Sequence, residues 1–155
     1  MDEAEGYREW AVGEPLRRYV WCTWTAPPSP AGPTEPVLPD GCIDIIWDGA
    51  RLFVSGPDTG PVLPETEGRQ CVGIRFRPGM APLFLGPPAD DLLDRRVDLG
   101  AMWPRTATLT ELLSETRSAR QAAAVLEAQL VSNGPGSPVT RNTHFPGPPS
   151  STAPS

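Results

Sequence analysis

The hydrophobic positions of the chain follow two periods, one typical of β-strands before residue 78 and one typical of α-helices after it. Runs rich in β-branched and aromatic residues predict the strands. They cover residues 18–24, 42–47, 51–54, 71–77 and, as a short edge piece, 61–64. Asp48 and Gly49 separate two of these runs and predict a tight hairpin turn between them.

Helical periodicity begins at Met80, which shares one apolar helical face with Leu83 and Phe84. Proline cannot continue a helix, so this short helix is expected to end before Pro87. Residues 89–93 are predicted to begin the next helical segment.

Two longer helices are predicted further on, each with the spacing of a capping box at its start. The capping pairs are Thr108 with Glu111 and Ser118 with Gln121. An apolar stripe follows each pair, made of Leu109, Leu112 and Leu113 in the first helix and of Ala122, Val125, Leu126 and Leu130 in the second. Two interpretations of the second stripe stay open, namely packing on its own domain and a homodimer seam.

Strands followed by helices predict a single α+β domain over residues 7–130. Residues 131–155 are rich in Pro, Gly, Ser and Thr and have no hydrophobic period. Such a segment buries too little apolar surface to offset its chain entropy, so a disordered C-terminal tail is predicted.

Length, charge and hydropathy argue for a single-domain protein that binds neither nucleic acid nor membranes. A chain of 155 residues suits one domain of ordinary size. A net charge of −6 argues against non-specific attraction to nucleic acid or to anionic lipid. No apolar run approaches the ~20 residues of a membrane helix, and the acidic start is unlike a signal peptide. A cytoplasmic protein without membrane contact is therefore predicted.

The residue types that usually carry metal or nucleophilic chemistry are scarce. The three cysteines, Cys22, Cys42 and Cys71, are odd in number and widely spaced, which favours burial over a disulfide framework or a zinc site. His144, the one histidine, lies in the predicted tail, which argues against His-dependent catalysis. Catalytic residues, a metal and a cofactor are therefore not expected.

Asp44 interrupts an otherwise apolar strand. Alternation places Asp44 on one face of that strand and Trp47 on the other. In the strand at 71–77, Arg75 and Arg77 share one face. One interpretation is a cross-strand ion pair between Asp44 and Arg75 that fixes the strand register.

A second interpretation is a ligand-binding site for a small effector. Asp44, Arg75 and Arg77 would supply its polar contacts, and Trp21, Trp24 or Trp47 would line it. A third is plain exposure of the charged face to solvent. A carboxylate pair of Asp40 with Asp44 is also conceivable, although turn chemistry explains Asp40 in its Pro-Asp-Gly setting.

Several segments carry a family resemblance through their order and spacing. They are Tyr7-Arg8-Glu9-Trp10, the Leu38-Pro39-Asp40-Gly41 turn with Asp44 and Trp47, Ser55-Gly56-Pro57, residues 73–79, the helix at 80–86, and residues 94–99 leading to Trp103. Together they resemble the N-terminal half of AraC-type bacterial transcription regulators, in the subgroup whose first domain is a cupin-like sensor. The resemblance implies a cupin-like antiparallel β-barrel or sandwich followed by short α-helices.

In such regulators an effector-sensing domain precedes two helix-turn-helix units that bind DNA. No helix pair with clustered basic residues follows Leu130 in this chain, so we expect a sensor or dimerisation module truncated before its DNA-binding domain, without direct DNA binding. The implied partners are a small-molecule effector and a second copy or a full-length regulator. Two alternatives stay open: a small cupin-like enzyme that uses carboxylates, such as an isomerase, and a stand-alone interaction protein.

Overall fold

The computed structural model describes residues 7–27, 42–57 and 70–135. The strands are β1 (Arg8–Trp10), β2 (Val20–Ala26), β3 (Asp44–Trp47), β4 (Leu52–Ser55), β5 (Cys71–Phe76) and β6 (Arg96–Asp98). The α-helices are α1 (Glu14–Arg17), α2 (Pro82–Leu85), α3 (Thr106–Ser114) and α4 (Ala119–Asn133). Two 3₁₀ helices, η2 (Ala89–Leu92) and η3 (Leu99–Ala101), flank β6. The α+β class predicted from the sequence is confirmed.

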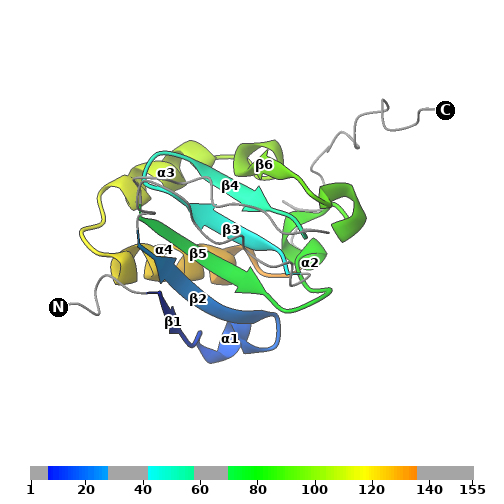
Figure 1. Cartoon of the computed structure of the whole chain (residues 1–155), viewed down its shortest axis with the longest axis horizontal. Helices are drawn as coiled ribbons and strands as arrows, with labels where there is room; N and C mark the ends of the chain where they lie inside the picture. The colour runs from blue at the N-terminus through cyan, green and yellow to red at the C-terminus, as the bar shows by residue number, and fades with distance from the viewer. Residues whose placement is uncertain (1–6, 28–41, 58–69, 136–155) are drawn as a thin grey trace, which may run out of the picture.

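All six strands form one antiparallel sheet in the order β1-β2-β5-β3-β4-β6 (Figure 1). The sheet is open, because β1 and β6 lie at opposite edges and do not pair with each other. Of the predicted barrel or sandwich, the barrel is therefore wrong. In a barrel the sheet encloses its own core, whereas here helices supply the apolar cover for one face.

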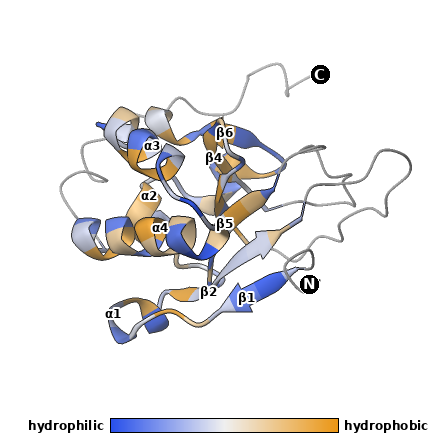
Figure 2. Cartoon of the chain, turned by 90° about the vertical axis from the view of Figure 1, so that its left-hand side faces the viewer, coloured by the Kyte–Doolittle hydropathy of each residue, from blue (hydrophilic) through white to orange (hydrophobic). Residues whose placement is uncertain are grey.

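The two edge strands were not predicted from the sequence. Each has three residues and a mostly charged sequence, which Figure 2 shows as hydrophilic colour on β1 and β6. Their exposed residues give no apolar alternation to detect. Charged side chains on an edge also discourage pairing with another chain.

The main core lies between the sheet and α4, which passes behind β5 and β2 in Figure 1. The sheet side chains in this core alternate along the strands and include Ile45, Trp47, Val54, Val72, Ile74 and Phe76. We call this side of the sheet the helix-covered face. From α4 it meets Ala122, Ala123, Leu126 and Leu130, all at most 4% exposed. The predicted stripe of this helix thus packs within its own domain.

Helix α4 begins and continues largely as its sequence predicts. The Ser118 hydroxyl accepts a hydrogen bond from the Gln121 amide at 3.1 Å, and the Gln121 side chain accepts one from the Arg117 amide at 2.7 Å. The helix runs three residues past the predicted boundary at Leu130 and ends at Asn133. The predicted tail from residue 136 on and the predicted edge strand at 61–64 lie outside the described residues.

The predicted capping box at Thr108 is wrong. Helix α3 begins two residues earlier, at Thr106, after Arg105 in a left-handed conformation with a φ of 64°. Thr108 therefore lies inside the helix. The apolar pattern is partly correct, because Leu109 and Leu113 are buried whereas Leu112 is 47% exposed.

The predicted hairpin between β3 and β4 is confirmed. The Asp48 carboxylate accepts hydrogen bonds from the amides of Ala50 (2.9 Å) and Arg51 (2.7 Å). Gly49 has a φ of +93°, which favours glycine. The side chain of Asp48 therefore stabilises the turn from within.

Strand β2 contains a β-bulge at Trp21. Val20 is opposite Phe76 on β5, and Cys22 is opposite the preceding residue, Arg75, so Trp21 is the extra residue. The Trp21 side chain is 52% exposed. On either side of the bulge, Val20 and Cys22 contribute to two different hydrophobic clusters of the domain.

Candidate functional site

The side of the sheet opposite α4 carries two of the five residues predicted to bind a ligand, Asp44 and Arg75. Strand register places on it Glu9 of β1, Cys22 and Trp24 of β2, Gly73 and Arg75 of β5, Asp44 and Ile46 of β3, and Phe53 and Ser55 of β4. We call this side the Arg75 face. It has a small buried cluster of its own, made of Cys22, Trp24 and Cys71.

Asp44 and Arg75 form the cross-strand ion pair that the alternation predicted. They lie directly opposite each other on β3 and β5. Arg75 Nε donates to Asp44 Oδ1 and Arg75 Nη2 donates to Asp44 Oδ2, both at 3.2 Å. Asp44 is only 8% exposed, and the Arg75 guanidinium compensates the charge of this largely buried carboxylate. Arg75 thus engages both carboxylate oxygens of Asp44, which is the arrangement expected of a pair that fixes the strand register.

Trp24 lies flat over Gly73, its partner across the β2–β5 ladder. A Cβ on Gly73 would come within 2.4 Å of Trp24 Cζ2, so only glycine leaves room for this ring. The Arg75 guanidinium carbon lies 5.8 Å from the centre of the Trp24 ring, and the Tyr7 ring stacks against Trp24 with centroids 6.1 Å apart. The Trp24 Nε1 atom is buried and makes no hydrogen bond in the structure as described.

Cys22 is an unreactive thiol in this setting. Burial, assisted by the nearby carboxylate of Glu9 and opposed by Arg75, raises the pKa of Cys22 from 9.0 to about 11. The thiol therefore stays protonated at neutral pH and acts as a small hydrophobic side chain. Cys22, Cys42 and Cys71 form no disulfide; Cys22 and Cys71 are buried, as predicted, whereas Cys42 is partly exposed.

The other predicted ligand contacts lie elsewhere. The Arg77 Nε atom donates to the Arg17 carbonyl at 2.8 Å, and its guanidinium lies 5.6 Å from the ring centre of the exposed Trp21. Trp47 is on the helix-covered face and 6% exposed. The five residues proposed as one site from the sequence thus occupy three separate places.

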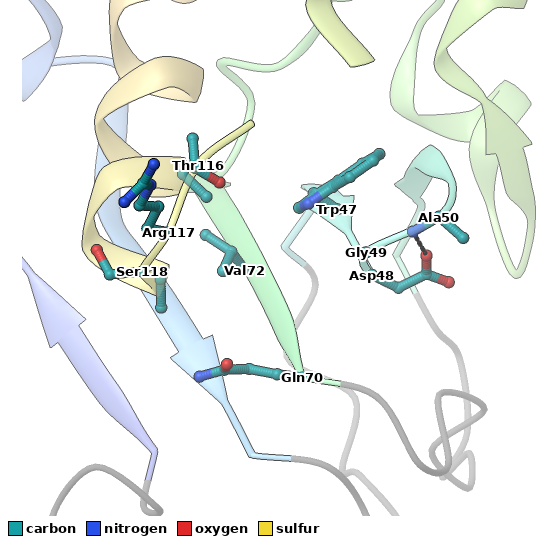
Figure 3. A pocket seen from close by; sticks show the side chains of 11 residues that line it. Trp47, Asp48, Gly49, Ala50, Gln70, Val72, Thr116, Arg117 and Ser118 are labelled. Atoms are coloured by element: carbon teal, nitrogen blue, oxygen red, sulfur yellow. Dashed lines mark hydrogen bonds between the residues drawn. The ribbon is translucent and has the colours of Figure 1, made fainter. Parts of the chain in front are cut away.

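A cleft lies near the start of α4 (Figure 3). Its volume is about 570 Å³, within the range of small-molecule sites. One wall is the β3–β4 turn with Trp47, the floor is the start of β5, and the other wall is the α3–α4 connection with the first turn of α4. The lining residues are Trp47, Asp48, Gly49, Ala50, Gln70, Val72, Thr116, Arg117, Ser118, Ala119 and Ala122.

Sequence reasoning named Trp47 but missed this cleft. Asp48, Gly49 and Ala50 directly follow Trp47, but the remaining lining residues come from segments about 25 and 70 positions further on, which the fold brings together. The only local signal for the cleft was the Ser118 cap, because it marks the start of a helix next to an arginine.

Residues 9–98, more than half of the chain, match DUF6597, a domain of unknown function. The chain belongs to this family. No curated protein and no solved structure matched the chain in the same comparisons.

The DUF6597 match begins in β1 and ends with the last residue of β6, so it covers essentially the whole sheet. It contains both members of the Asp44–Arg75 pair and the residues that form the turn side of the cleft. Helices α3 and α4 follow the matched segment. The cleft of this DUF6597 protein is therefore built partly from the family domain and partly from the helices after it.

Two further features concern the described residues of this DUF6597 protein. Over residues 7–27, 42–57 and 70–135, no three His, Cys, Asp or Glu side chains come together as metal ligands. Among the same residues no helix is both long enough and apolar enough to cross a membrane.

Proposed function

We propose that this domain is the ligand-sensing module of an AraC-like transcription regulator and that it binds a small effector without transforming it. The observation that carries the proposal is the DUF6597 match over residues 9–98, because domains of this family often occur in AraC-type regulators. The match includes most of the segments on which the sequence resemblance rests, from Glu9 to Asp98.

The cleft beside α4 supports a sensing role. A ligand held there would contact the sheet through the β3–β4 turn and the helix through residues 116–119. Helix α4 is also tied to the N-terminal segment, since the Gly13 amide donates to the Glu127 carboxylate at 2.8 Å. Binding could shift the position of α4 only by favouring one arrangement of these contacts over another.

The enzyme alternative gains no support from the carboxylates of the described residues. The two acids buried there, Asp44 and Asp48, are both engaged, the first with Arg75 and the second with the turn amides and Arg51. A pair of carboxylates for acid–base work needs one proton-accepting oxygen free to face a substrate. Asp40, the partner first considered for Asp44, lies outside the described residues.

The test is a thermal-shift screen of the purified chain with sugars, amines and organic acids, followed by NMR of each stabilising compound after incubation. A sensing module raises its melting temperature with a compound that is recovered unchanged. A ligand present at 100 times its Kd adds about 2.7 kcal/mol to the free energy of unfolding. Conversion of the compound would establish an enzyme instead.

A gel-shift assay at low salt addresses DNA binding by the same chain. With a net charge of −6, we expect no retention of duplex DNA. Sedimentation of the chain alone, and mixed with a full-length AraC-like regulator, separates self-association from pairing with a regulator. Tight, sequence-specific retention of DNA by this chain would contradict the proposal.

A further inference from the structure

The start of α4 carries an unbalanced positive charge. The helix has fifteen residues and no acidic residue in its first turn. Arg117 precedes its cap and Arg120 lies within its first turn. Both arginines lie near the positive end of the helix dipole, where an anion is favoured and a cation is not. Arg120 stacks over the Trp10 ring at 5.4 Å, which leaves Arg117 as the cation of the cleft.

The Arg117 side chain has no acidic partner among residues 7–27, 42–57 and 70–135. The acid that lines the opposite wall, Asp48, is already committed. Its carboxylate accepts the amides of Ala50 and Arg51, and it pairs with the Arg51 guanidinium at 3.6 Å. Figure 3 shows this carboxylate on the turn side, away from Arg117.

Trp47 supplies a hydrogen-bond donor to the cleft. Its side chain is 6% exposed, yet within the part of the chain that the structure describes its Nε1–H group donates no hydrogen bond. Figure 3 shows the indole nitrogen at the end of the ring that faces the cleft. This N–H group is not among the buried polar atoms that lack a partner, so it opens into the cleft, where water or an acceptor group of a ligand can take its hydrogen bond.

The rest of the lining is largely apolar and small. Val72, Ala119 and Ala122 line one side, and Gly49 and Ala50 form the turn opposite. These residues offer no charge to a ligand, and their small side chains leave space for an apolar group. A volume of about 570 Å³ suits a molecule of metabolite size and not a polymer.

We propose that this cleft binds a small organic acid. Its carboxylate would lie between the first amides of α4 and Arg117 and would accept the Trp47 Nε1–H, and its apolar body would cover Val72 and Ala122. The biological meaning of this site rests on the proposed sensing function, since the acid would be the effector. The binding itself can be measured without that assumption.

The experiment is an NMR titration of the ¹⁵N-labelled chain with phenylacetate and octanoate as probe acids. The five tryptophans give five indole N–H signals, and loss of one signal in Trp47→Phe assigns the signal of Trp47. We expect saturable movement of that signal with at least one acid. The neutral analogues phenylacetamide and octanamide should bind at least about tenfold more weakly, because they lack the charge that Arg117 and the helix end favour.

Matched arginine variants test the assigned contacts. Arg117→Gln should weaken binding of the acid by about tenfold, the usual scale for loss of one charge-assisted contact. Arg18→Gln, which removes an exposed arginine remote from the cleft, should leave binding unchanged. Both positions are exposed, so the variants are expected to fold.

Three results would overturn the site: no movement of the Trp47 signal with either acid on the order of 10 mM, equal binding of acid and amide, or equal loss in both arginine variants. A reporter assay in cells separates this site from the sensing function. If the acid binds the cleft but changes no promoter activity, the site stands and the sensing function fails. If another effector acts while the Trp47 signal stays fixed, the sensing function stands and the site fails.

Discussion

The two faces of the sheet are stabilised in different ways, and three consecutive residues of β5 show both. Ile74 points into the helix-covered face and is completely buried among apolar side chains. Its neighbours Gly73 and Arg75 point to the Arg75 face, where one makes room for Trp24 and the other pairs with Asp44. Apolar volume therefore holds one face together, and specific pairs hold the other.

The difference has a consequence for substitution. An apolar core tolerates another hydrophobic residue of similar volume, because dispersion and burial have no direction. An ion pair and a ring seated on a glycine each require one geometry. The Arg75 face should therefore set the register of β2, β3 and β5, and the helix-covered face should supply most of the stability.

The largest effect is expected for Ile74→Ala. Removing a fully buried isoleucine from the centre of the sheet leaves a cavity against α4 and should lower the free energy of unfolding by about 3–4 kcal/mol. Urea denaturation followed by circular dichroism measures this loss. Leu112→Ala, on the exposed side of α3, is the control and should cost about 0.5 kcal/mol or less. Equal losses would mean that α4 does not cover the sheet as described.

The next largest effect is expected for Gly73→Ala. This change should lower the free energy of unfolding by about 2–3 kcal/mol, because the added Cβ displaces the buried Trp24 ring. If the clash with Trp24 is the cause, the same substitution should cost clearly less in a Trp24→Leu background. Denaturation of the four proteins in this cycle gives the coupling directly. Additive losses would show that the cost comes from the strand backbone and not from the ring.

The Asp44–Arg75 pair should have a coupling energy of about 1–2 kcal/mol, measured with Asp44→Asn, Arg75→Gln and the double variant. The single Asp44→Asn change leaves the partly buried Arg75 without its carboxylate. Glu14 and Arg17 form the matched surface pair, at 3.5 Å with both side chains more than half exposed. Its cycle should give less than about 0.5 kcal/mol, since exposed pairs are weak. If the coupling energy of Asp44 and Arg75 is no larger than that of the surface pair, the ion pair does not fix the strand register.

The smallest effect concerns pH. The pKa of Cys22 is about 11 in the folded chain and 9.0 for an ordinary thiol, so only the unfolded chain loses this proton between those values. The folded state then binds more protons, and its stability should fall as pH rises from about 9 to about 11. Other groups titrate in this range, so the measurement is the difference in denaturation midpoint between the wild type and Cys22→Ala. A difference that stays constant from pH 8 to 11 would contradict the burial of this thiol.

The central strands could be predicted from the sequence because two local signals agree there. Residues 42–47 and 71–77 alternate or are β-branched, and the Asp48-Gly49 turn fixes the hairpin. The Asp44–Arg75 pair followed from the same alternation once the two strands were neighbours. The barrel did not follow from any residue, since closure depends on whether the edge strands meet.

The cleft could not be predicted for a different reason. Alternation correctly separated Trp47 from Asp44, but nothing local indicates that the first turn of α4 lies opposite Trp47. That neighbourhood arises from packing between segments about 70 residues apart. Arg77 and Trp21 were misplaced for a related reason, because the bulge turns Trp21 out to the surface and alternation does not foresee an extra residue.

The single extra residue in β2 reverses the face of the sheet to which the residues after it point. On a regular strand, Val20 and Cys22 would point the same way, but the inserted Trp21 sends them to opposite sides. Deletion of Trp21 would therefore move the residues on one side of it to the opposite face of the sheet. Either Val20 would leave the helix-covered face or Cys22 would leave the Arg75 face. The number of residues in this strand therefore decides which of its side chains face α4.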